Sequence, residues 1–144
     1  MLEDLVQRRP YNAVTDLVDA PVARGACRQN RGHRWLERFN LWLQARSCRF
    51  SSALLDNGLR PEERLALLLN DTVDFPVAFW GGVRAGIVVL PLNTLLTAEQ
   101  YAYILGDSRA AAIVASASLL KTLQPVLDRL PRGLRKIRPA SIPP

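Results

Sequence analysis

Hydrophobic residues follow two different patterns in the second part of the chain. Nearly continuous apolar runs, which indicate strands buried on both faces, occur at residues 63–69, 87–90 and 110–115. Apolar residues that recur every three or four positions, which predict amphipathic helices, occur at residues 74–85, 97–105 and 118–130. A further short apolar run at residues 134–137 predicts a fourth strand.

Strands and helices therefore alternate along the chain. This order predicts an α/β fold with a mostly parallel sheet flanked by helices on both faces. Ligands of such sheets bind beyond the carboxyl ends of the strands. We therefore expect any ligand near the turns at Asn70-Asp71, Asn93-Thr94 and Ser116–Ser118.

The first part of the chain contains two helical patterns and one stretch without a pattern. Residues 11–24 predict a short helix whose apolar positions are Val14, Leu17, Val18 and Val22. Residues 43–56 predict a better helix, with a column formed by Leu43, Ser47, Phe50 and Leu54. Residues 26–42 lie between them and show no clear periodicity, although Trp35, Phe39 and Trp42 are spaced as one helical face.

Short-range signals mark the helix ends. Glycine tolerates the left-handed conformation that ends a helix, which predicts stops at Gly58, Gly86 and Gly106. Side chains that accept hydrogen bonds from free backbone N–H groups predict the starts. Asp71 and Asp74 predict the start of the helix at residues 74–85, and the capping box of Thr97 with Gln100 predicts that of the helix at residues 97–105. Ser116 or Ser118 predicts the start of the helix at residues 118–130.

Composition limits the chain to one domain or part of one. The chain has 144 residues, 49% of them hydrophobic, which suits a globular core. No apolar run approaches the roughly 18 residues that span a bilayer. Acids at Glu3 and Asp4 argue against a signal peptide, so we expect a cytoplasmic location without membrane association.

Basic charge is concentrated in one segment. The chain carries a net charge of +6, and Arg28, Arg31, Arg34 and Arg38 stand against Glu37 alone, which gives +3 from that short stretch. Such a cluster, with aromatic residues between the arginines, is compatible with a nucleic-acid-binding module that uses residues 28–38. An out-of-frame insert from GC-rich DNA explains the same arginine bias without a partner, and is the interpretation that we favour.

Metal binding has little support in the sequence. Cys27, His33 and Cys48 match no compact zinc spacing and lack a fourth ligand. We expect Cys48 to pack as a small apolar residue. No metal site and no catalytic residue is predicted for this chain.

A series of short motifs, in order, resembles a known family. The motifs are residues 71–79, Asn93-Thr94-Leu95-Leu96-Thr97, Tyr101-Ala102-Tyr103 and Asp107-Ser108-Arg109-Ala110, preceded by residues 11–13 and 58–64. Together they are similar to benzoate-CoA ligases and related aryl-CoA ligases, which belong to the adenylate-forming superfamily. The similarity covers residues 10–25 and 43–137.

The resemblance implies a parent reaction. Such enzymes form an acyl-adenylate from an aromatic carboxylate and ATP, with Mg²⁺, and then transfer the acyl group to CoA. The family's glycine-rich phosphate loop and its catalytic lysine domain would lie downstream, and neither occurs in this sequence. We therefore expect residues 1–137 to form part of the large N-terminal domain, without activity and without a cofactor of its own.

Asn93 and Thr94 are candidates for contact with a cofactor. They follow a strand, where CoA or a nucleotide could approach. The competing interpretation is that Asn93, Thr94 and Thr97 serve as turn and cap residues.

Two segments depart from the family pattern. The resemblance implies a β-hairpin at residues 26–42, where this chain is rich in arginine. One codon choice for residues 28–40, read one base later, spells Gly-Lys-Thr-Ala-Ala-Ile-Asp-Gly-Ser-Asn-Ala-Ser-Thr, which is similar to the family. We therefore hypothesise a frameshift that enters near Ala26 and recovers near Leu43. Residues 138–144 are interpreted as an aberrant or truncated tail, and a non-functional remnant remains an alternative.

Overall fold

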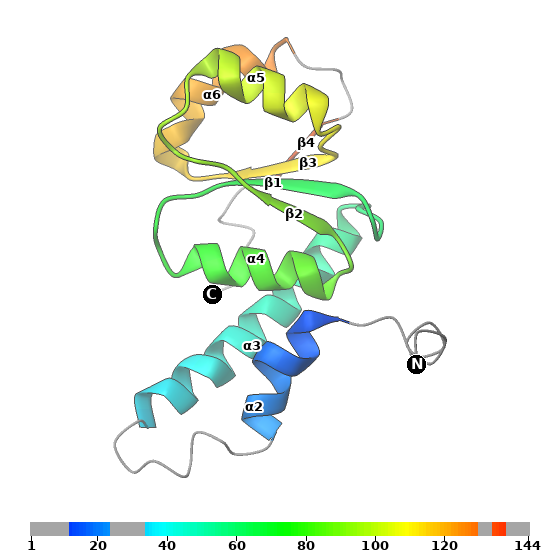
Figure 1. The fold of residues 1–144 in the computed structure, drawn as a ribbon, viewed down its shortest axis with the longest axis vertical. Helices are drawn as coiled ribbons and strands as arrows, with labels where there is room; N and C mark the ends of the chain where they lie inside the picture. The colour runs from blue at the N-terminus through cyan, green and yellow to red at the C-terminus, as the bar shows by residue number, and fades with distance from the viewer. Residues whose placement is uncertain (1–11, 24–33, 130–133, 138–144) are drawn as a thin grey trace, which may run out of the picture.

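A four-stranded parallel sheet forms the centre of the molecule. The computed structural model describes residues 12–23, 34–129 and 134–137. The strands are β1 (Arg64–Leu68), β2 (Val88–Pro91), β3 (Ala112–Ala115) and β4 (Arg135–Ile137), in the spatial order β2-β1-β3-β4. All three strand pairs are parallel (Figure 1), which confirms the predicted α/β fold.

Helices cover both faces of this sheet. One face carries α3 (Arg34–Asp56) and α4 (Asp74–Arg84), and the other carries α5 (Ala98–Asp107) and α6 (Leu120–Leu127), as Figure 1 shows. Side chains of β1 alternate between the two sides, as the strand geometry requires. Leu65 and Leu67 pack with Phe50 of α3, whereas Ala66 and Leu68 pack with Tyr101 of α5.

The strand β2 lies at the edge of the sheet. Val88 is 40% exposed, so the prediction that residues 87–90 are buried on both faces is wrong. The Val88 N–H donates to the carbonyl of Glu63, just before β1, and the Leu92 N–H donates to the carbonyl of Leu67 in β1. The backbone nitrogen of Pro91, at an alternate position, therefore points away from β1. Because proline has no N–H, the outer edge of β2 is less able to pair with another strand.

The helix α3 is longer than the sequence predicts. It begins at Arg34 rather than Leu43, so the described part of the segment 26–42 is helical. The Phe39 and Trp42 rings stack with their centroids 5.6 Å apart, and Trp42 packs against the core. The predicted buried column is confirmed, with Leu43, Ser47, Phe50 and Leu54 all buried.

The first helical segment contains a widened turn. A π-helix at Thr15–Asp19 (η1) leads into the short helix α2 (Ala20–Ala23), and the Ala20 N–H donates to the Thr15 carbonyl. Val14 and Val18 are buried as predicted, but Leu17 is 62% exposed. The wider turn explains this difference, because residues three positions apart no longer stack as they do in an α-helix.

Two of the three predicted glycine stops are confirmed. Gly58 and Gly86 have φ values of 79° and 74°, in the left-handed region. The stop at Gly106 is wrong, since α5 runs to Asp107 and the Ser108 N–H still donates to the Ile104 carbonyl. Arg109, with φ of 50°, takes the left-handed position instead.

The predicted helix starts differ in their outcome. The capping box is confirmed, with Gln100 N to Thr97 Oγ1 at 3.4 Å and Thr97 N to Gln100 Oε1 at 2.9 Å. Acid capping of α4 is wrong, because the helix begins at Asp74 without a side-chain cap. A turn formed by backbone groups leads into α4, in which the Phe75 N–H donates to the Thr72 carbonyl.

Candidate functional site

The carboxyl edge of the sheet contains a point where the chain diverges to opposite faces. The strands β1 and β3 are neighbours, but β1 continues into α4 on one face and β3 continues towards α6 on the other. In open parallel sheets this arrangement leaves a crevice between the two strand ends, where ligands commonly bind. Asn70 follows β1 at this point, and Ser116 follows β3.

Hydrogen bonds join the two sides of this point. The Asn70 backbone N–H donates to Ser116 Oγ at 3.0 Å, and Asn70 Nδ2 lies 3.0 Å from Ser118 Oγ. The Ser116 N–H also donates to the Leu68 carbonyl at 2.9 Å. The structure therefore brings together two of the three turns that the sequence singled out.

The two serines do not cap α6, contrary to the prediction. Ser116 precedes a single 3₁₀ turn, η3 (Ala117–Leu119), and makes no side-chain cap, while α6 starts later, at Leu120. The hydroxyl oxygens of both serines instead accept from Asn70. A long-range partner thus replaces the local cap, and no short-range pattern signals such a partner.

Asn93 and Thr94 lie in a turn that is fastened to α5. The Asn93 Oδ1 accepts from the Leu95 N–H at 2.9 Å, and the Asn93 carbonyl accepts from the Tyr101 hydroxyl at 2.8 Å. Tyr101 is almost fully buried, whereas Asn93 is exposed and Thr94 is half-buried. Contact of Asn93 or Thr94 with a cofactor stays a prediction.

A further cluster of polar side chains, formed by Asp19, Gln44 and Arg84, was not predicted from the sequence. Asp19 accepts two hydrogen bonds from Arg84, at 2.6 and 2.8 Å, and a third from Gln44 Nε2 at 3.0 Å. The hydrogen bond from Arg84 is the main cause that lowers the pKa of Asp19, and the same bond raises the pKa of Arg84. Sixty-five positions separate the two residues, so no local pattern could have paired them.

The side chains considered for metal binding are not assembled by the described residues. Cys27 and His33 lie outside the described ranges, and Cys48 is exposed on α3, so the prediction that it packs as an apolar residue is wrong. Within those ranges, no group of three His, Cys, Asp or Glu side chains could hold a metal ion.

The arginine-rich segment is only partly described. Arg28 and Arg31 lie outside the described ranges, and Arg38 is exposed at the start of α3. Two of the aromatic side chains considered for base stacking, Phe39 and Trp42, stack on each other, and Arg46 lies 5.0 Å from the centre of the Trp42 ring. These contacts give nucleic-acid binding no support.

A search for membrane-spanning helices was negative for the described segments. None of their helices combines the length and the apolar character needed to cross a bilayer.

Comparison with known families decides the identity of the fold. A family model described as AMP-binding enzyme matches residues 42–141. The chain belongs to this family. The resemblance of the sequence motifs to adenylate-forming ligases is thereby confirmed.

Members of the AMP-binding enzyme family with known activities are similar to this chain. The 4-hydroxybenzoate–CoA/benzoate–CoA ligase of Rhodopseudomonas palustris is 42% identical over 129 residues, which cover 85% of this chain and 23% of that protein. A benzoate-CoA ligase structure from Burkholderia xenovorans LB400 is 43% identical, with a TM-score of 0.64, over 67% of this chain and 19% of that one.

A third similar protein is an anthranilate-CoA ligase of known structure. The anthranilate-CoA ligase in complex with anthranoyl-AMP is 27% identical, with a TM-score of 0.64, over 68% of this chain and 19% of that one. The chain thus spans less than a quarter of the length of these relatives. Its sheet corresponds to part of a domain of the family.

Proposed function

We propose that this chain is part of the N-terminal domain of an ATP-dependent aryl-CoA ligase. The parent reaction forms an acyl-adenylate and then a thioester with CoA. The observation that carries this proposal is the 42% identity to a benzoate ligase over 85% of the chain. The structural similarity to a second benzoate-CoA ligase, at 43% identity, supports it.

The proposed role of the described residues is that of a scaffold. Strands β1 and β3 are buried, and their carboxyl ends are held together by Asn70, Ser116 and Ser118. These hydrogen bonds lie at exposed positions and link the ends of the two strands directly. A rigid junction of this kind would position downstream segments that carry the phosphate loop and the catalytic lysine.

In this proposal, ATP, Mg²⁺ and CoA are held mainly by segments of the parent enzyme downstream of the described residues. No group of three potential metal ligands occurs among the described residues, and the hydroxyl oxygens at the β1–β3 junction accept from Asn70. We therefore assign no chemical step to them. Asn93 and Thr94 are candidates for cofactor contact, and the position of their turn after β2 supports that assignment.

The proposed substrate of the parent enzyme is benzoate or a similar aromatic carboxylate. The relatives named above are ligases of benzoate, 4-hydroxybenzoate and anthranilate, which supports this class. We further propose a cytoplasmic location, since these substrates are joined to CoA.

We also propose that residues 26–42 arose from a local frameshift. The family model begins to match at residue 42, next to the point where the hypothesis places the return to the original frame. The genomic DNA tests this. The +1 frame of this stretch should encode sequence similar to the family, and a frame without such similarity would contradict the hypothesis.

The proposal that this chain is a scaffold, and that downstream segments carry the chemical groups, is tested by an assay of the chain alone. Purified chain incubated with ATP, benzoate and CoA should release no AMP, because the phosphate loop and the lysine are missing from the sequence. The Rhodopseudomonas palustris ligase serves as the positive control. Measurable turnover by the chain would contradict the scaffold role.

A further inference from the structure

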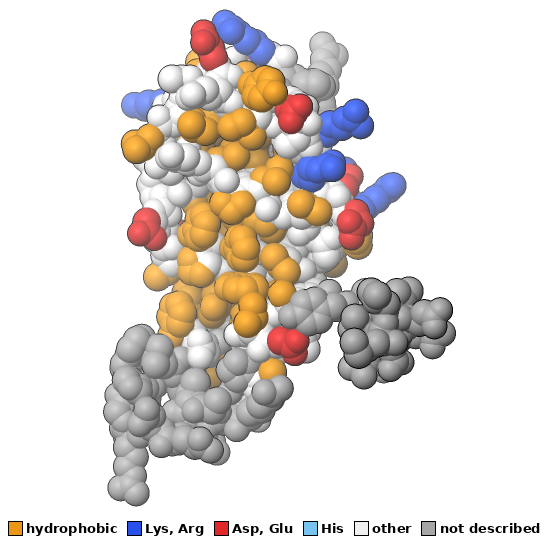
Figure 2. Space-filling model, in the orientation of Figure 1, with side chains coloured by type: hydrophobic (Ala, Val, Ile, Leu, Met, Phe, Trp, Pro, Cys, Tyr) orange, Lys and Arg blue, Asp and Glu red, His pale blue; other side chains and the backbone are white. Residues whose placement is uncertain are grey.

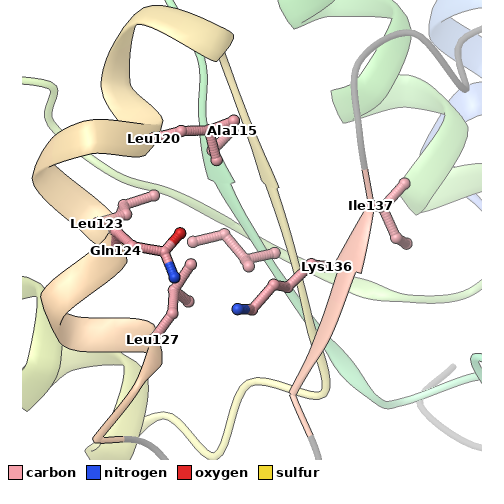
Figure 3. Close-up of a pocket in the computed structure, with 8 residues that line it drawn as sticks. Ala115, Leu120, Leu123, Gln124, Leu127, Lys136 and Ile137 are labelled. Carbon is pink, nitrogen blue, oxygen red and sulfur yellow. The ribbon is translucent and has the colours of Figure 1, made fainter.

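A cavity lies between α6 and the part of the sheet formed by β3 and β4 (Figure 3). Its volume is about 360 Å³, within the range of roughly 300–1,000 Å³ that is usual for small-molecule sites. The lining is mostly apolar and includes Ile113, Leu120, Leu123 and Leu127, with Gln124 and Lys136 as its polar members. The cavity includes Ala115, the last residue of β3, but not Asn70, Ser116 or Ser118, which form the junction of β1 and β3.

The two polar side chains come from opposite walls of this cavity. Lys136 extends from β4, and Gln124 extends from α6. Figure 3 shows the ammonium of Lys136 and the amide nitrogen of Gln124 turned towards the same space. Because both groups are hydrogen-bond donors, this space is suited to an acceptor that carries negative charge.

No acidic side chain lines the cavity to neutralise Lys136. Within the described part of the chain, its ammonium makes no ion pair. The nearby Asp128 is bound through Oδ1 to Gln124 Nε2 at 3.0 Å, which uses one N–H of that amide and leaves the second for a ligand. The residues that line the cavity therefore carry one positive charge, on the exposed side chain of Lys136, and the carboxylate of Asp128 lies beside Gln124 outside that lining.

We propose that this cavity binds a small amphipathic monocarboxylate. The apolar part of the ligand packs against the leucines of α6 and Ile113, and its carboxylate accepts from Lys136 and Gln124. An apolar wall with one cationic group at a single point fits this class better than a polar metabolite, which would leave its hydroxyl groups without partners. The proposal does not depend on the ligase assignment, because every group that it uses belongs to the described residues.

The proposal is tested with the full chain by methyl NMR during titration with octanoate and, separately, with benzoate. A ligand of about ten non-hydrogen atoms should bind with a Kd on the order of 1 mM. Saturable shifts should appear at the methyl groups of Ile113, Leu123, Leu127 and Ile137 with at least one of the two acids. Their relative affinities distinguish an alkyl from an aryl ligand. Octanol, which lacks the charge, should bind about tenfold more weakly than octanoate.

A pair of lysine variants separates a specific site from general attraction to a basic protein. Lys136→Gln should raise the Kd about tenfold, since it removes the charge-assisted hydrogen bond. Lys121→Gln is the matched control, because Lys121 is exposed on α6, next to the cavity, and does not line it. Equal affinity of the Lys136 variant and the wild type would overturn the proposal. Absence of saturable binding by both acids, or shifts centred on Leu96 and Ile104 of the groove at α5, would also overturn it.

Discussion

Asp19 and Arg84 form a bidentate ion pair that joins the first helical segment to the end of α4. Arg84 Nη2 lies 2.6 Å from Asp19 Oδ1, and Arg84 Nη1 lies 2.8 Å from Asp19 Oδ2. The pair is largely shielded, with side-chain exposures of 20% and 25%. Asn12 adds a second link, since its Nδ2 donates to the Val83 carbonyl at 3.0 Å. These contacts hold residues 12–23 against the layer formed by α3 and α4.

Loss of this ion pair should make the free energy of unfolding less dependent on pH in the acidic range. The pKa of Asp19 is lowered in the folded protein, so its contribution is fully present above the unfolded pKa of about 3.9. It is lost as the pH falls through the lower folded pKa. Asp19→Asn should therefore destabilise the protein at pH 7 by about 1–2 kcal/mol and flatten the decline of stability below pH ~4. Urea unfolding across this pH range measures both effects.

Asp16→Asn is the control for this prediction. Asp16 lies in the same segment and is exposed. Its substitution should change the free energy of unfolding by less than about 0.5 kcal/mol. Equal effects of the two substitutions would show that the Asp19–Arg84 pair contributes nothing specific.

The contact between α3 and α4 requires a glycine at position 81. A Cβ atom at Gly81 would lie 2.7 Å from Phe50 Cδ1 and 3.0 Å from the Ser47 carbonyl oxygen. Gly81→Ala should therefore cost about 1–3 kcal/mol through overpacking. Gly106→Ala is the control, since nothing lies within 4 Å of its Cβ, and it should stabilise α5 by about 0.5–1 kcal/mol. Thermal melts of both variants measure these changes in stability. A Gly81 variant as stable as the wild type would contradict the close contact between α3 and α4 at this position.

The junction of β1 with β3 should show coupling between Asn70 and Ser118. Their side chains lie 3.0 Å apart at an exposed position, so Asn70→Ala and Ser118→Ala should each cost about 0.5–1 kcal/mol. The double variant should lose less than the sum, because one hydrogen bond is counted in both single variants. Urea unfolding of all four proteins gives the coupling energy, and strict additivity would contradict a direct bond.

The Asn93–Thr94 turn should depend on one hydroxyl group. Tyr101→Phe removes the buried donor to the Asn93 carbonyl and leaves that acceptor without this partner, at a cost of about 1 kcal/mol. Amide hydrogen exchange around Leu95 should become faster in this variant. Tyr103→Phe, on an exposed ring of the same helix, should change neither quantity. Unchanged exchange in the Tyr101 variant would show that the turn does not need the hydroxyl.

Local patterns predicted the elements that depend on local physics. The apolar run that includes Leu65 predicted β1, and the Thr97–Gln100 box forms as expected. The exposure of Val88 was not predictable in this way, because an edge strand and a central strand can have the same apolar composition. Its position depends on the strand order, which the sequence pattern leaves open.

Long-range polar contacts were beyond the reach of sequence reasoning for a related physical reason. Ser116 and Ser118 were assigned to a helix cap, and both instead accept from Asn70, more than forty positions away. The Asp19–Arg84 pair likewise depends on how two helical segments pack. Such partners are determined by tertiary packing, whereas capping propensity acts over a few residues.

Figure 2 shows an apolar band along the face of the molecule that carries the sheet edge. Exposed residues such as Val73 and Val88 contribute to the apolar surface of the protein. A band of this kind is expected on a surface that is covered in a larger assembly. It agrees with a chain that spans 23% of the Rhodopseudomonas palustris relative.

The central claim, that this chain is the scaffold of an aryl-CoA ligase domain, is tested most directly by a chimera. Residues 42–137 would replace the matching segment of the Rhodopseudomonas palustris ligase, with which this chain shares 42% identity. The account predicts that the chimera folds and forms benzoyl-CoA from benzoate, ATP and CoA, because the chemical groups remain in the recipient. A chimera that folds cooperatively and binds ATP but forms no benzoyl-CoA would contradict the account.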